Sequence, residues 1–150
     1  MSIQSVKTRL AQLQKTIPGI HQAYAQAPEM INVSDMPLFI NLTGRGNPDY
    51  ASEGDFHNLE TRIYSMRLYV LPVALGIPGE GERLVEPLIE TINTFFSARP
   101  SLGGLENIFT AYLIGDSGII QLPYQAGGDL YIGCDFTLQV KELLEFSYAK

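Results

Sequence analysis

Two segments in which apolar and polar residues alternate constrain the fold of this 150-residue chain more than any other feature. Side chains of a strand point alternately to the two sides of a sheet, so each segment is expected to be a strand with one face on the core. In residues 59–71, one face would carry Tyr64, Met66, Leu68 and Val70. The other would carry Ile63, Ser65, Arg67 and Tyr69 and be only partly covered. In residues 130–140, the apolar face would hold Leu130, Ile132, Cys134, Phe136, Leu138 and Val140.

Two helices are expected from apolar residues at helical spacing. The first covers residues 3–17, where Pro18-Gly19 stops it. The second covers residues 82–98 and carries a broad apolar stripe that makes it the principal core helix. Pro87 should bend this second helix or mark its real beginning.

The remaining segments predict shorter strands and connections. Strands are expected at 20–26 and 38–43, followed by a long polar loop or extended hairpin tip at 44–58. The sequence Gly115-Asp116-Ser117-Gly118 predicts a tight turn that joins strands 108–114 and 119–124 as a β-hairpin. The order of elements predicts one domain, 1–150, of the α+β class. Its sheet would be mostly antiparallel or mixed, with the helices packed on one face.

Charge and hydropathy argue against several classes of protein. The chain has 10 basic and 16 acidic residues, a formal net charge of -6, and no basic cluster with which to grip phosphates. The sequence contains no run of about 20 apolar residues, so no membrane span is predicted. Lys7, Arg9 and Lys15 interrupt the N-terminal region where a signal peptide would be apolar. The chain is therefore expected to be made in the cytoplasm.

Candidate chemical groups do not form a convincing site. Asp55, His57 and Glu60 could begin a metal shell, but the chain has only one other histidine, His21. Glu82, Glu86 and Glu90 share a helix face opposite the apolar stripe and should be in water. Ser117 lies in a turn rather than a strand-to-helix elbow, and Cys134 is expected to be a buried small hydrophobe. We expect no catalytic residue, no cofactor and no metal.

The order of the segments is similar to that of the tail-terminator (tail-completion) proteins of long-tailed bacteriophages. The segments that carry the resemblance are a first helix, "IPGIHQAY", the strand "MPLFINL", the long strand "TRIYSMRLYVLP", a helix ending "FFSARP" and the last strand "YIGCDFTLQVKEL". The resemblance covers almost the whole chain. It implies a structural virion protein located in the tail or neck.

The resemblance also implies a set of partners. Such a subunit forms a homo-oligomer, a hexameric ring at the head-proximal end of the tail tube. The ring ends polymerisation of the tail tube protein and joins the tail to the head-tail connector protein, and DNA passes through it without specific binding. Rings require heterologous contacts that close by rotation. The residues expected to supply these subunit or tail-tube contacts are Arg45, Tyr50, Phe56, Arg67 and Tyr69.

Two other interpretations remain open from the sequence. The chain could be another neck or head-tail joining subunit, which the pattern of segments separates poorly from a terminator. It could also be a non-viral adaptor domain that binds partners by strand addition along an exposed sheet edge. The sequence favours an enzyme least among these interpretations.

Overall fold

The computed structural model describes residues 2–49, 57–75, 79–125 and 127–145. The elements within these residues, in chain order, are α1 (Ser2–Gln14), β1 (Gln22–Tyr24), η1 (Val33–Asp35), β2 (Leu38–Asp49), β3 (His57–Pro72), η2 (Val73–Leu75), α2 (Glu80–Ser97), β4 (Ile108–Pro123) and β5 (Leu130–Glu145). The strands form one sheet in the order β1-β2-β3-β5-β4. Only the β1–β2 pair is parallel, so the sheet is mixed.

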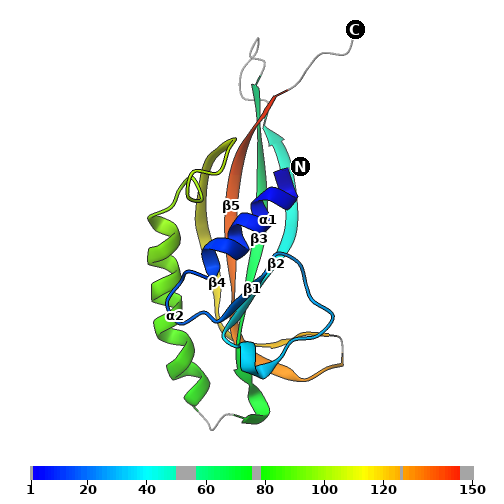
Figure 1. Ribbon diagram of the computed structural model, residues 1–150, viewed down its shortest axis with the longest axis vertical. Helices are drawn as coiled ribbons and strands as arrows, with labels where there is room; N and C mark the ends of the chain where they lie inside the picture. Colours follow the sequence, from blue (N-terminus) through cyan, green and yellow to red (C-terminus); the bar gives the residue numbers. More distant parts are fainter. Residues whose placement is uncertain (1, 50–56, 76–78, 126, 146–150) are drawn as a thin grey trace.

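Both helices cover the same face of this sheet (Figure 1). Val6 and Leu10 of α1, together with Ile92 and Phe96 of α2, pack against the apolar face of β3 and β5. The fully buried strand residues there are Tyr64, Met66, Leu68, Cys134, Phe136, Leu138 and Val140. The expected α+β class is therefore confirmed. The core faces predicted for the two alternating segments are confirmed too, except at Leu130, which is 43% exposed.

A second, smaller core lies on the opposite face, where the sequence predicted only partial cover. Its buried members are Met36, Leu38, Ile40, Tyr69 and Leu122. Partly buried Ile31, in the connection before β2, packs against them. The second face of β3 was expected to be only partly covered. This expectation is wrong around Tyr69, which is 2% exposed. Farther along β3, Ser65 and Ile63 remain half-buried.

The predicted hairpin at Gly115-Asp116-Ser117-Gly118 is wrong, because β4 is one strand along its whole length. Two residues, Ser117 and Gly118, oppose the single residue Asp135 between the pairs Asp116–Phe136 and Ile119–Cys134. This is a β-bulge. Gly118 has a φ of 70°, which a glycine adopts readily, and its amide donates to Asp116 Oδ1 at 2.8 Å. The turn residues serve the bulge rather than a chain reversal.

Of the two alternatives predicted for 44–58, the described residues support the extended hairpin rather than the loop, because 44–49 and 57–58 are all strand. β2 continues to Asp49, and β3 begins at His57, with one bulge between Thr43 and Gly46. The Arg62 Nη1 group donates to the Gly44 carbonyl at 3.1 Å. Polar and glycine-rich residues concealed this extension because they are depleted from strands.

The helix ends also differ from the prediction. α1 ends at Gln14, three residues before the predicted end, and α2 begins at Glu80. Pro87 therefore lies inside α2 and does not mark its beginning. Glu82, Glu86 and Glu90 are exposed, as the amphipathic pattern predicted.

One buried polar contact ties α1 to the sheet. Gln14 and Asn41 are both fully buried, and their side-chain amides bond to each other twice, each at 2.8 Å. Asn41 Nδ2 also donates to the Tyr24 carbonyl at 3.0 Å. Because a buried amide needs its partners, this pair fixes where α1 lies along β2.

The outer side of β4 meets the connection that follows α2. The amide of Ala111 donates to the carbonyl of Pro100 at 2.7 Å. β4 is the last strand of the sheet, so this bond uses a backbone group on the sheet edge.

Candidate subunit interface

The structure describes three of the five residues predicted to make subunit contacts. Arg45 is exposed on β2, and Arg67 is half-buried on β3. Tyr69 lies in the second core, where its hydroxyl donates weakly to the Pro123 carbonyl at 3.4 Å. The single chain therefore does not offer the Tyr69 side chain to a neighbour. Tyr50 and Phe56 lie outside the described residues.

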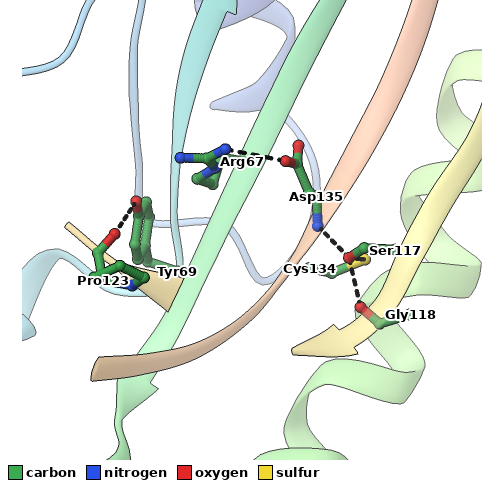
Figure 2. A network of polar contacts seen from close by, with 7 residues as sticks. All are labelled: Arg67, Tyr69, Ser117, Gly118, Pro123, Cys134 and Asp135. Carbon is green, nitrogen blue, oxygen red and sulfur yellow. Dashed lines mark hydrogen bonds and ion pairs between the residues drawn. The ribbon is translucent and has the colours of Figure 1, made fainter. Parts of the chain in front are cut away.

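Arg67 belongs to a polar network that crosses three strands (Figure 2). Its Nη2 lies 3.2 Å from Asp135 Oδ2, and the Asp135 amide donates to Ser117 Oγ at 2.9 Å. The Ser117 hydroxyl in turn donates to the Gly118 carbonyl at 2.8 Å. Arg67 Nε and Asp135 Oδ1 are buried and find no hydrogen-bond partner in the described part of the chain. The ion pair is thus single rather than bidentate.

Three exposed apolar side chains occur within six residues of β4. Phe109 is 62% exposed, Tyr112 is 42% exposed and Ile114 is 48% exposed. Tyr112 lies on the face opposite the helices, where Gln139 Nε2 donates to its hydroxyl at 2.6 Å. We call these three residues the β4 patch. Sequence reasoning missed the patch because a nearly continuous apolar run does not show which side chains are outside, although this run was the available signal.

Two further polar side chains of β3 differ in their surroundings, since Glu60 is paired with a cation and the buried Tyr64 hydroxyl has no hydrogen-bond partner in the described residues. Arg62 Nη2 lies 2.6 Å from Glu60 Oε1, so one member of the proposed Asp55, His57 and Glu60 set already has a cationic partner. Burial, and after it the charge of Glu142, raises the pKa of Tyr64. Asp55 and the His57 side chain lie outside what the structure describes. Within the described residues, no three His, Cys, Asp or Glu side chains form a metal-binding group.

The two candidate nucleophiles are held in structural roles. The Ser117 hydroxyl bonds within the bulge, as described above, and has no histidine among its hydrogen-bond partners in the described residues. Cys134 is fully buried, and burial raises the pKa of its thiol to about 11. A thiol that stays protonated is a poor nucleophile.

Neither helix in the described part of the chain has the length and apolar character that a membrane span requires.

The Cys134 thiol is expected to make the protein less stable at alkaline pH. Its folded pKa of about 11 lies above the ordinary value of 9.0, so the unfolded chain loses this proton first as the pH rises. The free energy of unfolding should therefore decline between these two values. Urea titrations from pH 8 to 11 would measure it. Tyrosines also ionise in this range, so Cys134→Ala is the reference, and a decline as steep in that variant would contradict the assignment.

No protein-family model matches the chain, and no curated protein is significantly similar to it.

Proposed function

We propose that this protein is a structural subunit of a phage virion, a tail terminator. In this role it forms a ring, a hexamer, on the head-proximal end of the tail tube. The ring ends tube polymerisation and presents a surface to the head-tail connector, and DNA passes through its centre. The protein itself has no catalytic role.

The β4 patch is the observation that carries this proposal. Monomeric proteins scatter single exposed apolar residues, whereas a gathered group marks an interaction surface. Two of its three residues, Phe109 and Tyr112, are aromatic, and aromatic residues are enriched in protein interfaces. The patch lies on a strand at one side of the sheet, while exposed Arg45 lies on β2 toward the other side. Two different surfaces are what a heterologous ring contact needs.

The segment order of the sequence supports the choice of a tail terminator among ring-forming proteins. The expected α+β architecture is the one observed, with long antiparallel strands β3, β4 and β5 and both helices on one face. The groups that might have supported an enzyme are used structurally, since Cys134 is buried and Glu60 is paired with Arg62. The polar network around Arg67 likewise holds β3, β5 and β4 together.

The first test is the mass of the purified chain in solution. One chain weighs 16.6 kDa, and a ring should appear at six times this value or shift toward it as the concentration rises. Replacing Tyr112 with aspartate should return the particle to a single chain. Each subunit of a ring uses the patch once, and placing a charge in an interface centre costs about 2 kcal/mol or more per contact. Light scattering after gel filtration measures both results.

The matched control is Gln121→Asp, which adds the same charge to an exposed position of the same strand. This variant should keep the mass of the parent protein. Immunogold electron microscopy should find the protein at the head-proximal end of tails. A chain that is monomeric at every concentration and absent from virions would refute the proposal.

The adaptor interpretation receives less support from β4. Strand addition needs free backbone groups along a sheet edge, and the Ala111 amide is already bonded to the Pro100 carbonyl. If the chain were another neck subunit, the β4 patch would serve it equally well. The position of the immunogold label along the neck therefore distinguishes this role from that of a terminator.

A further inference from the structure

A cavity of about 250 Å³ opens beside the connection between β4 and β5. Its walls come from two segments that are distant in sequence, the connection before β2 and the end of the β4–β5 hairpin. The lining residues are Met30, Ile31, Tyr124, Gln125, Gly128, Asp129 and Tyr131. We call this cavity the tyrosine pocket. It lies apart from the β4 patch, and the proposed ring does not account for it.

The walls of the tyrosine pocket are held in place before any ligand arrives. The Tyr124 hydroxyl donates to the Pro28 carbonyl, and Gln125 Nε2 donates to the Glu29 carbonyl at 3.2 Å. The buried ring of Tyr69 packs edge-to-face against both wall tyrosines. Its centroid lies 6.0 Å from that of Tyr124 and 5.6 Å from that of Tyr131. A preformed pocket loses little entropy when it binds.

The charged side chain in the described lining of the tyrosine pocket is a carboxylate, although Arg67 of β3 interacts with the hydroxyl of Tyr69, which packs against the wall tyrosines. Residues 16–44 and 100–140, which supply all of its lining, contain no lysine and no arginine. Asp129 lies in the lining and is exposed, and exposed Glu29 belongs to the wall segment before β2. The two wall segments therefore offer aromatic faces and carboxylates without supplying a cation of their own.

We infer that the tyrosine pocket binds an arginine side chain presented by a partner protein. A guanidinium is planar and stacks on tyrosine rings, and it pairs with a carboxylate such as that of Asp129. The aliphatic stem of the arginine would lie against Met30 and Ile31. An anionic group would be repelled by Asp129. This inference does not depend on the proposed ring, because one chain supplies the whole pocket.

The probe for this inference is N-acetylarginine amide, titrated into the ¹⁵N-labelled full chain and followed by NMR. Its control is N-acetylcitrulline amide, which has nearly the same shape but no charge. The arginine compound should shift the amide signals of Gly128 and Asp129, and the citrulline compound should not. Asp129→Asn should weaken the apparent affinity about two- to fivefold, as expected when one exposed charge pair is lost. Glu106→Gln removes an exposed carboxylate outside the pocket and should leave the affinity unchanged.

Three results would overturn the inference. The first is the absence of any shift with the arginine compound, and the second is an equal shift with the citrulline compound. The third is an unchanged affinity in Asp129→Asn, which concerns an exposed side chain and should fold like the parent. N-acetyllysine amide should bind more weakly, and equal binding would overturn the choice of arginine. Failure of the chain to form rings would refute the proposed function but leave this titration valid.

Discussion

Replacing Gly133 with alanine is expected to give the largest loss of stability of any substitution considered. A methyl group at this position of β5 would lie 1.8 Å from the carbonyl oxygen of Leu68 on β3. The obstacle is backbone of the central strand pair, so no side-chain rotation can relieve it. We expect the free energy of unfolding to fall by about 4 kcal/mol or more. A typical domain has about 5–15 kcal/mol in total. Urea denaturation followed by circular dichroism would measure the loss.

Gly115→Ala provides the matched control for this substitution. Gly115 lies on the neighbouring strand β4, and a methyl group there would meet nothing within 4 Å. Its stability should stay within about 0.5 kcal/mol of the parent. If the two alanine variants unfolded at the same urea concentration, the close approach of β5 to β3 at Gly133 would be contradicted.

Breaking the buried amide pair between Gln14 and Asn41 is expected to have the second-largest effect. Asn41→Leu would leave the Gln14 amide buried without its partner, and the Tyr24 carbonyl would lose a donor. A buried polar group without a partner costs about 1–3 kcal/mol, so the variant should lose about 3 kcal/mol. Gln14→Met should be similarly unstable, because it isolates Asn41. Thermal and urea unfolding measure both losses.

The double variant Gln14→Met with Asn41→Leu tests whether the two residues act as a pair. Replacing both partners with apolar groups of similar shape removes the unsatisfied atoms, so the double variant should be more stable than the sum of the two losses predicts. Strict additivity of the two losses would show that the amides do not depend on each other.

The alternating segments made the centre of the fold predictable from the sequence. Cys134, Phe136 and Leu138 fall on the buried face because a strand has a period of two and only one arrangement buries all of them. The apolar stripe of α2 similarly placed Ile92 and Phe96 in the core. Both inferences needed only local periodicity, which does not depend on where other segments lie.

The bulge at Ser117 and Gly118 could not be predicted in the same way. Glycine and aspartate at this spacing suit a tight turn and a bulge equally well, since both require a residue with positive φ. The bulge forms instead of a turn because β5 is long enough to pair with all of β4. The same limit applied to β2, whose glycine-rich end became strand because β3 pairs with it.

The candidate sites depended on contacts between distant segments, so the sequence indicated them only in part. Arg45, which was expected to contact a neighbouring subunit, is exposed in the single chain. Tyr69 was expected to make such a contact too, but the connection before β2 folds over its face of the sheet. The tyrosine pocket has the same origin, since the Tyr124 hydroxyl meets the Pro28 carbonyl 96 residues away. The periodicity of a sequence does not predict such contacts between distant segments.

The bond between Ala111 and Pro100 has a consequence for aggregation of the chain. An open ladder of amides and carbonyls is a template onto which strand after strand can add, and this is the route to fibres. With an outward amide of β4 already bonded to its own chain, that route is obstructed at Ala111. The exposed Phe109, Tyr112 and Ile114 side chains therefore lie beside an edge position whose amide is not available to an added strand.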